Sequence, residues 1–344
     1  MSGPADRPTG VVSIKDVAAA AGVSPATVSN VLNRPERVAP ATRRKVLETI
    51  DAVGYVRNAS ASRLRILDNY ALGLLIADIE NPFLRNLAQG AQETAEEYGY
   101  SVLLCDAARS TERLIRQIDF LAEQQVTGVL ASGSTLPGVG DALDKLRSRG
   151  TKVVLVDEAE GTFDHCSVGV DDERGGWLVG SHLLEIGRRR IAYVTIDVPF
   201  RPFDDRLAGL RRAAAQHPDS ASVEIERLEV SLESLDDGGE AAAAILAGGF
   251  DAVFSANDPI AIGLYRKFVH AGVSIPEDIA LIGYDDVPMA SMLPVPLSSV
   301  RQPTRMLGTT ATKLLIEECA DDDHEHQHVA FRPSLTARTS TLGT

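Results

Sequence analysis

Hydrophobic residues recur with two different periods along the chain, and the change between them falls near residue 70. Before that point, apolar residues stand at helical spacing, as at Ile14, Val17 and Ala21, which occupy positions i, i+3 and i+7. After it, short apolar runs rich in Val, Ile and Leu alternate with longer amphipathic stretches. The pattern predicts a small helical part followed by a larger α/β part.

Three short helices are predicted in the first part. The first covers residues 14–21 and ends at a glycine. Ser24 is a favourable N-cap for the second, Pro25–Asn33, which has proline at the preferred first position. The third covers about Pro40–Val53. Two helices joined by a tight glycine-containing turn are typical of a helix-turn-helix, although short helix pairs in enzymes show the same pattern.

The second part contains nine apolar runs of β type, separated by helical stretches. The runs are residues 71–77, 101–105, 128–131, 152–156, 167–170, 191–195, 223–230, 252–255 and 279–284. The helical stretches are residues 83–98, 111–124, 138–149, 173–186, 205–216, 238–246, 259–271 and 304–319. Because strands alternate with helices, the strands are expected to be parallel and covered on both faces. Nine strands predict two sheets with a cleft between them.

Charge separates the same two parts of the chain. The length of 344 residues favours about two domains. Residues 1–66 hold ten Lys or Arg and five Asp or Glu, whereas the remainder holds 24 basic and 43 acidic residues. A basic part on an acidic body is expected to meet a polyanion, which would repel the body.

The sequence disfavours several other classes of protein. Cys105, Cys166 and Cys319 lie far apart and form no CxxC pair, so no disulfide framework, metal site or other cofactor is expected. The chain shows neither a secretory leader nor an 18-residue apolar run, so we expect a reduced cytoplasm and no membrane contact. It lacks GxGxxG, GxxxxGK(S/T) and GxSxG, which argues against an enzyme. The remaining rival, the solute-binding protein of a transporter, is disfavoured by the basic helix-turn-helix.

A short acidic and histidine-rich stretch, residues 321–328, holds three of the seven histidines. Alternate histidine spacing is compatible with Zn²⁺ or Ni²⁺ binding. The stretch follows the last predicted helix, and its composition favours a solvated loop instead.

Residues 13–65 carry a series of short motifs in a specific order: Ile-Lys-Asp-Val-Ala, Ala-Gly-Val-Ser, Thr-Val-Ser, Val-Leu-Asn, Thr-Arg and Gly-Tyr. This segment closely resembles the DNA-binding head of LacI/GalR-family transcriptional regulators. The resemblance continues through Asn81-Pro82-Phe83, Val156-Asp157, Ala256-Asn257-Asp258 and Gly283-Tyr284-Asp285-Asp286, and it covers essentially the whole chain.

The resemblance implies a fold class and a function. The expected fold is a small all-α helix-turn-helix head, residues 1–57, and an α/β periplasmic-binding-protein-like body of two parallel-sheet subdomains, residues 70–344. A hinge helix and linker, residues 58–69, would join them. The expected function is that of a transcriptional repressor. It would bind a palindromic double-stranded DNA operator as a homodimer and respond to a small-molecule effector, a carbohydrate or related metabolite.

The resemblance also implies which residues contact DNA. Pro25, Ala26 and Asn30 would face base edges in the major groove, where Asn can pair bidentately with adenine. Family members often have Arg in place of Asn30, so an altered operator is expected. Ala61 and Leu64 would enter the minor groove from a hinge helix too short to be stable alone. The remaining expected DNA contacts are Ser24, Thr27, Ser29, Arg44, Tyr55 and Asn58; for Thr27 and Ser29, helix capping and packing are equally good explanations.

The effector site implied by the resemblance consists of Phe83, Asp157, Arg206, Asn257 and Asp285. Each polar member follows a predicted strand or opens a predicted helix, where ligands bind in open α/β sheets. Two carboxylates, an arginine and an asparagine suit vicinal hydroxyl groups of a sugar. Alternatively, the two aspartates cap turns or helices, and the phenylalanine packs in the core. The family often has an aromatic residue near positions 232–235, and this chain has none there. Asp78 and Arg201 are weaker candidates for the site, and Trp177 is expected to belong to the core and not to the site.

Overall fold

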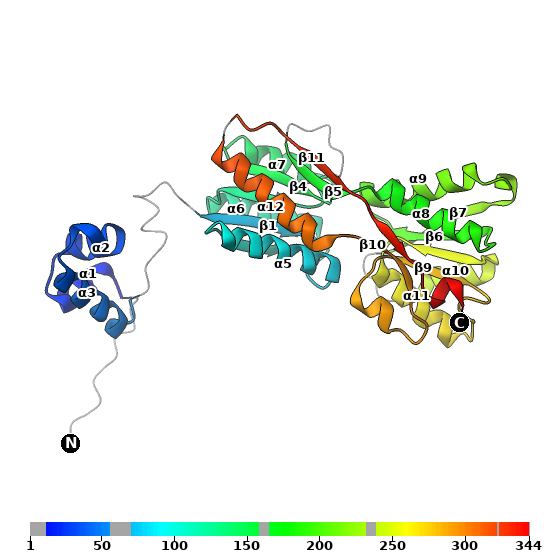
Figure 1. Ribbon diagram of the computed structural model, residues 1–344, viewed down its shortest axis with the longest axis horizontal. Helices are drawn as coiled ribbons and strands as arrows, with labels where there is room; N and C mark the ends of the chain where they lie inside the picture. The colour runs from blue at the N-terminus through cyan, green and yellow to red at the C-terminus, as the bar shows by residue number, and fades with distance from the viewer. Residues whose placement is uncertain (1–11, 56–69, 158–164, 232–238, 322, 344) are drawn as a thin grey trace, which may run out of the picture. The chain divides into compact units, whose positions relative to one another are not determined.

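The computed structural model describes residues 12–55, 70–157, 165–231, 239–321 and 323–343 (Figure 1). The chain divides into two compact units, residues 1–69 and residues 70–344, which we call the head and the body. Each unit is described by itself below. Among the helices of the described ranges, none combines the length and the apolarity that crossing a membrane requires.

The head consists of α1 (Ile14–Ala21), α2 (Pro25–Asn33), the 3-10 turn η1 (Pro35–Arg37) and α3 (Pro40–Val53). Ser13 and Asp16 form a capping box at the start of α1. The Ser24 side chain accepts a hydrogen bond from the Thr27 N–H at 3.1 Å, so it caps α2 as predicted. A small shared core holds the three helices together; its buried members are Val17, Ala18, Ala21, Val28, Val31 and Val46.

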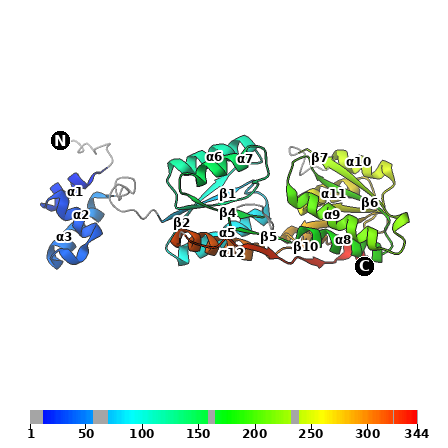
Figure 2. The same ribbon diagram turned by 90° about the horizontal axis from the view of Figure 1, so that it is seen from above.

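The body contains two six-stranded sheets within the described residues. Sheet A is ordered β11-β5-β4-β3-β1-β2, and every pair in it is parallel. Its strands are β1 (Ala71–Ile76), β2 (Ser101–Asp106), β3 (Gly128–Ala131), β4 (Lys152–Val156), β5 (Ser167–Val170) and β11 (His328–Phe331). Helices α5 (Pro82–Glu97) and α12 (Thr304–Ala320) cover one face, and α6 (Thr111–Glu123) and α7 (Val139–Arg147) cover the other (Figure 2).

Sheet B is ordered β12-β10-β9-β8-β6-β7 and is parallel except for the β10–β12 pair. Its strands are β6 (Arg190–Ile196), β7 (Glu224–Val230), β8 (Ala252–Ser255), β9 (Ala280–Asp285), β10 (Ser298–Arg301) and β12 (Ser334–Thr336). The associated helices are α8 (Asp172–Glu185), α9 (Arg201–Gln216), α10 (Gly239–Gly248), α11 (Asp258–His270) and α13 (Thr339–Leu342), with 3-10 turns η2 (Ser220–Ser222) and η4 (Pro288–Met292). The chain passes between the sheets three times: from β5 to α8, from β10 to α12, and from β11 to β12.

The architecture confirms the predicted fold class of an all-α head and an α/β body with two largely parallel sheets. The nine predicted runs all form strands, but β10, β11 and β12 were not among them. These three are only three or four residues long, and their place is fixed by pairing with a neighbouring strand. Helix α9 begins at Arg201, four residues before the predicted start, because Pro202 provides a favourable first turn.

Glycine residues bring α8 and α9 into close contact. A Cβ on Gly176 would overlap the main-chain oxygen of Arg206, and a Cβ on Gly209 would overlap that of Glu173. These two positions therefore let the helix backbones touch, which fixes where α9 presents Arg206. Trp177, which we expected in the core of this helix, is only half-buried, and its Nε1 donates a hydrogen bond to Gln216 at 2.9 Å.

Candidate nucleic-acid interface and ligand cavity

Helix α2 presents one apolar face to the head core and one polar face outward. Val28 and Val31 are buried, whereas Pro25, Ala26 and Asn30 are exposed. The three residues predicted to read base edges therefore share an accessible helix face. An exposed Asn on such a face has its amide donor and acceptor available for the edge of an adenine.

Ser24 and Thr27 have a structural role at the start of the same helix. Besides the capping bond to the Thr27 N–H, the two hydroxyl groups lie 2.9 Å apart and share a hydrogen bond. Ser29 is half-buried. Ser24 is thus the predicted N-cap, and for Thr27 the structure shows the capping explanation that the sequence had left open.

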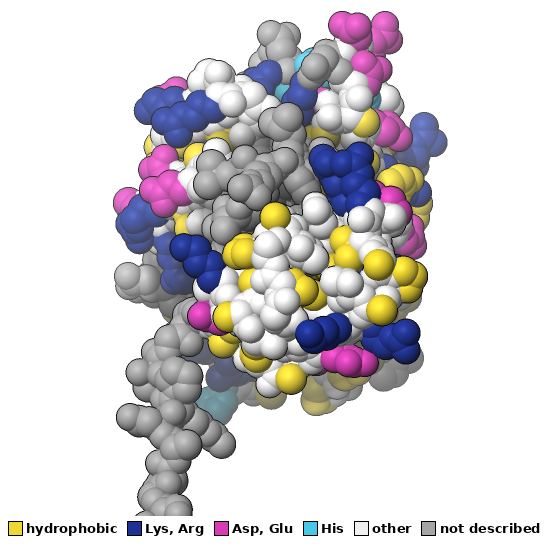
Figure 3. All heavy atoms as spheres, turned by 90° about the vertical axis from the view of Figure 1, so that its left-hand side faces the viewer, with side chains coloured by type: hydrophobic (Ala, Val, Ile, Leu, Met, Phe, Trp, Pro, Cys, Tyr) yellow, Lys and Arg dark blue, Asp and Glu magenta, His cyan; other side chains and the backbone are white. Residues whose placement is uncertain are grey.

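The other predicted DNA contacts divide into two groups. Arg44 is exposed on α3, between the equally exposed Arg43 and Lys45. Tyr55 is half-buried and packs against the head core. In Figure 3, Lys and Arg side chains stand at several separate places among uncharged and hydrophobic ones. Asn58, Ala61 and Leu64 lie outside the described residues.

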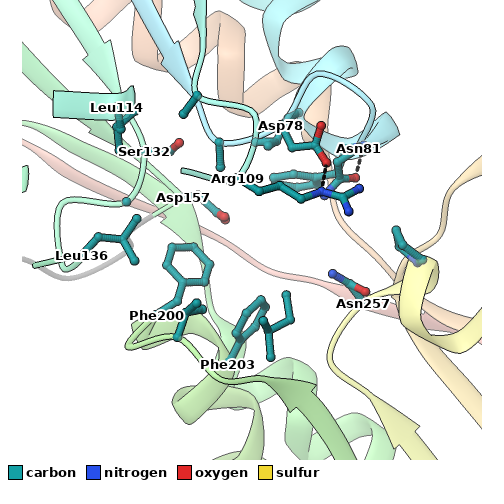
Figure 4. Close-up of a pocket in the computed structure, with 18 of the residues that line it drawn as sticks. Asp78, Asn81, Arg109, Leu114, Ser132, Leu136, Asp157, Phe200, Phe203 and Asn257 are labelled. Carbon is teal, nitrogen blue, oxygen red and sulfur yellow. Dashed lines mark hydrogen bonds and ion pairs between the residues drawn. The ribbon is translucent and has the colours of Figure 1, made fainter. Parts of the chain in front are cut away.

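The body contains a cavity of about 320 Å³ between its two sheets (Figure 4). All five predicted effector residues line it: Phe83, Asp157, Arg206, Asn257 and Asp285. Asp157, Asn257 and Asp285 stand at the carboxyl ends of β4, β8 and β9, where open α/β sheets bind ligands. Three strand ends and two helices thus bring together residues that are far apart in the sequence.

Arg206 is fixed in the cavity wall by partners on three sides. It is 3% exposed, and its Nε donates a hydrogen bond to Asp172 Oδ1 at 2.8 Å. Its Nη1 donates to the Ala256 carbonyl, and its guanidinium carbon lies 3.6 Å from the centre of the Tyr284 ring. Burial is the largest single influence on the pKa of Arg206 and lowers it, but Asp172, Tyr284, Asp285 and Asp157 together outweigh burial and raise the pKa, so the guanidinium keeps its charge.

Asp285 and Asp157 are buried acids with unusual backbone conformations. Their φ angles are 106° for Asp285 and 69° for Asp157, in a region that non-glycine residues rarely adopt. Gln302 Nε2 donates a hydrogen bond to Asp285 Oδ1 at 2.7 Å. Burial, followed by the like charge of Asp258, raises the pKa of Asp285 well above its usual value. Asp285 therefore keeps its proton to a higher pH than an exposed aspartate, although the Arg206 charge opposes this, and the protonated acid can both donate and accept.

Asn257 and Phe83 each combine a structural role with a place in the lining. The Asn257 Oδ1 accepts a hydrogen bond from the Ile260 N–H at 3.0 Å and so caps α11. Its amide nitrogen points toward the cavity (Figure 4). Phe83 is 5% exposed and belongs to the core of sheet A, with its remaining surface on the cavity.

The cavity also has lining residues that were missed in the sequence or considered weak. Asp78, a weak candidate, forms an ion pair of 2.6 Å with Arg109, and both line the cavity. Phe200 and Phe203 also line it, with their ring centres 5.0 Å apart. Phe200 and Phe203 stand on either side of Arg201-Pro202, where the chain turns from β6 into α9. A strand-to-helix junction of this kind is a sequence signal that could have indicated both rings. The other weak candidate, Arg201, is not among the lining residues and pairs with Asp205 instead.

Positions 232–235, where the family often has an aromatic residue and this chain has none, fall outside the described residues. Phe200 and Phe203 provide aromatic surface from α9 and the turn before it. The cavity therefore has a mixed lining: aromatic rings and aliphatic side chains around a few directed polar groups. This is the usual character of a small-molecule site.

Both the head and the body are similar to known protein families. A model described as bacterial regulatory proteins, lacI family, matches residues 13–58. A model of a periplasmic binding protein-like domain matches residues 181–341. The HTH-type transcriptional repressor PurR of Photobacterium profundum is 31% identical over 342 residues, covering 96% of this chain and 98% of that protein. The HTH-type transcriptional regulator MalR of Streptomyces coelicolor is 31% identical, covering 95% and 96%.

Solved structures agree with these relatives. The lac repressor dimer bound to operator and the anti-inducer ONPF is similar with a TM-score of 0.82 and 25% identity, covering 97% of this chain and 100% of that one. A LacI family transcriptional regulator from Enterococcus faecium with bound ribose has a TM-score of 0.71 and 29% identity, covering 80% and 99%. The regulator CelR in complex with cellobiose has a TM-score of 0.68 and 29% identity, covering 97% and 100%.

Proposed function

The chain belongs to the lacI family of bacterial regulatory proteins, and from that premise we propose that it is an effector-controlled transcriptional repressor and not an enzyme. Residues 1–57 would read DNA, residues 58–69 would form the hinge, and residues 70–344 would bind effector and dimerise. The observation that carries the proposal is the body's cavity, lined by directed polar groups, in a chain whose head exposes a base-reading helix face. Such a protein acts in the cytoplasm, where the DNA is.

The proposed DNA contact divides into reading and positioning. Asn30 reads a base pair in the major groove, with Pro25 and Ala26 beside it. Arg44 binds phosphate, which adds affinity without sequence preference. Two copies of the chain would place two such helices on the half-sites of a palindrome. Ala61 and Leu64 of the hinge would enter the minor groove between the half-sites.

The proposed effector is a sugar or a related polyhydroxylated metabolite. Asp157 and Asp285 offer oxygen acceptors to hydroxyl groups, and the Asn257 amide nitrogen offers a donor. Phe200 provides an apolar surface for the carbon–hydrogen face of a sugar ring. The ribose- and cellobiose-bound members of the family support this class of ligand.

The experiment that tests this function starts with selection of binding sites from random double-stranded DNA by the full-length protein. We expect enrichment of a palindrome and specific binding by fluorescence anisotropy. A thermal-shift screen of sugars, nucleosides and sugar phosphates should then find a ligand that raises the melting temperature, because ligands that bind only the folded state stabilise it. That ligand should change the operator affinity. Failure to enrich any sequence would contradict the proposed DNA function; a nucleoside as the only hit would contradict the sugar class alone.

A further inference from the structure

Side chains able to bind a metal ion gather at one end of sheet A, away from the cavity. Cys166 directly precedes β5, and Glu318 lies in the last turn of α12. His324 and His326 lie in the loop that leads from α12 into β11. The parallel pairing of β11 with β5, which sets His328 opposite Ser167, brings this loop beside Cys166. The cluster lies at the end of the sheet where β1 also begins.

The distances within the cluster suit a tetrahedral ion. Cys166 Sγ lies 3.2 Å from His324 Nε2 and 4.0 Å from His326 Nδ1. Ligand atoms of Cys166, Glu318 and His326 all lie within 4.8 Å of one another. Bond lengths of zinc to sulfur and nitrogen imply a separation of about 3.6 Å between two tetrahedral ligands. The two sulfur-to-nitrogen separations lie on either side of that value. His324 stands outside the group of three whose ligand atoms are mutually close, so its imidazole would have to shift to complete a tetrahedral set.

Glu318 provides an independent indication of a cation. Its side chain is 6% exposed, and Oε2 has no hydrogen-bond partner among the residues that the structure describes. A buried carboxylate oxygen without a partner is costly, and such a group is normally paired or bound to a metal. The Cys166 side chain beside it is fully buried, so the cluster is an interior site with a histidine loop over it.

We propose that Cys166, Glu318, His324 and His326 form a binding site for a divalent transition metal ion of the zinc type. A thiolate, two imidazoles and a carboxylate form a ligand set that zinc accepts. Binding would exchange the Cys166 thiol proton for the metal and release that proton to solvent. The ion would fasten the histidine loop to α12 and β5. The sequence favoured a solvated loop because Cys166 and Glu318 join the histidines only through the β5–β11 pairing.

Groups next to the cluster would stabilise a Cys166 thiolate, and they show which histidine of the stretch is not a proposed ligand. The Gln327 N–H donates a hydrogen bond to Cys166 Sγ at 3.3 Å, the kind of contact that stabilises a metal-bound thiolate. His328 Nδ1 lies 2.9 Å from Ser167 Oγ, so this third histidine of the stretch is held elsewhere. His328 is therefore a matched control for His324 and His326.

The test uses the full-length protein without a histidine tag, stripped with a chelator and dialysed against Zn²⁺. We expect one zinc per chain by elemental analysis, and a higher melting temperature that a chelator reverses. Substitution with Co²⁺ should give the visible bands of a tetrahedral site and a sulfur-to-cobalt charge-transfer band. The absence of stoichiometric zinc, or a cobalt spectrum without thiolate character, would overturn the proposal.

Single substitutions test which residues bind the metal ion. Cys166→Ser, His324→Ala and His326→Ala should lose the stoichiometric ion, whereas Cys105→Ser and His328→Ala should keep it. Cys105 is buried in the same sheet but far from the loop, so it controls for the loss of a buried thiol. If Cys166→Ser retained zinc as wild type does, adventitious binding by surface histidines would replace the proposal. Should that variant fail to fold by circular dichroism, Glu318→Gln decides instead: it should bind zinc more weakly, and unchanged affinity would count against the site.

Discussion

Arg206 and Tyr284 are stacked in the wall of the cavity, with the guanidinium carbon 3.6 Å from the ring centre. Nε of the same guanidinium donates a hydrogen bond to Asp172 Oδ1. Because all three side chains are buried, the cation is stabilised by the aromatic face and by an ion pair with little competition from water. Arg206 is thus a candidate for binding the effector, and its buried contacts with Asp172 and Tyr284 also give it a structural role.

Replacing Arg206 should therefore damage the fold as well as ligand binding. Arg206→Ala leaves Asp172 as a buried carboxylate without its cation, which we expect to cost about 3–5 kcal/mol in the free energy of unfolding. Urea denaturation followed by circular dichroism measures the loss. Arg201→Ala is the control, because its pair with Asp205 is at the surface and should contribute less than about 1 kcal/mol. If both variants were equally stable, the buried Arg206–Asp172 pair would contribute no more to stability than the surface pair.

Gly176 should be intolerant of a methyl group. Gly176→Ala would push α8 away from the Arg206 main chain, and we expect about 1–3 kcal/mol of destabilisation from the overlap. Gly140→Ala, in the helix α7, is the control: its Cβ would lie 3.4 Å from the nearest atom, the Ser134 oxygen. That change should be neutral or stabilising, since alanine favours a helix. Thermal unfolding of both variants checks the difference, and a stable Gly176→Ala would refute the close-contact argument.

Most of the strands that the sequence predicted are apolar runs, because such runs are buried on both faces of a parallel sheet. The predicted strand β7 instead alternates polar and apolar residues and is mostly exposed or half-buried. It could not predict β10 or β12, where Ser298-Ser299 and Ser334 are held by pairing and by hydrogen bonds with distant residues. No local pattern marks such strands. Their positions depend on a sheet that is assembled from other parts of the chain.

For the candidate site, the family resemblance identified residues at strand ends but not their partners. Asp172 precedes Arg206 by 34 positions, and Gln302 follows Asp285 by 17, so neither pairing has a local sequence signal. Phe200 and Phe203 were not among the residues that the resemblance singled out, and the position near 232–235 where the family often has an aromatic residue has none in this chain. The proximity of the histidine-rich stretch to Cys166 had no local sequence signal either, since Cys166 and His324 are 158 positions apart.

Base reading by α2 is tested at Asn30, and phosphate contact by α3 is tested at Arg44. Asn30→Ala should weaken binding to the selected operator by about 1–3 kcal/mol and relax preference at one symmetric base pair. Arg44→Ala should weaken specific and random DNA alike, and reduce the salt dependence by roughly one counterion. Both residues are exposed, so neither change should alter the fold. Anisotropy titrations at several salt concentrations separate the two effects; unchanged base preference in Asn30→Ala would refute the placement of α2.

The contribution of Asp258 to stability should fall as pH rises through the weakly acidic range. Burial raises the pKa of Asp258 from 3.8 to about 7, although Ser299 Oγ and the Val287 N–H donate hydrogen bonds to its carboxylate. Between these values the folded state holds a proton that the unfolded state has released. The stabilisation is therefore complete below about pH 4 and is lost as pH approaches 7. Urea denaturation at pH 5 and pH 7 measures the slope.

The matched variants for this slope are Asp258→Asn and Asp219→Asn. The first removes the titrating group and should reduce the difference between the two pH values, with a remainder from Asp285, whose pKa burial also raises. The second, at an exposed position, should keep the wild-type dependence. A slope in Asp258→Asn as steep as in the wild type would assign the effect to other groups.

The last prediction concerns how Asp285 recognises the effector. Its raised pKa favours the protonated acid, which accepts from Gln302 and can donate to a ligand oxygen. Asp285→Asn preserves both abilities, because its carbonyl oxygen accepts and its amide nitrogen donates. Asp285→Ala removes them and leaves Gln302 without its acceptor. We therefore expect Asp285→Ala to lose the effector response while still binding the operator, and Asp285→Asn to retain much of it. Calorimetric titration with the ligand from the thermal-shift screen, beside operator anisotropy, tests this. A normal response in Asp285→Ala would remove Asp285 from the site, and a complete loss in Asp285→Asn would show that the ionised carboxylate binds the ligand.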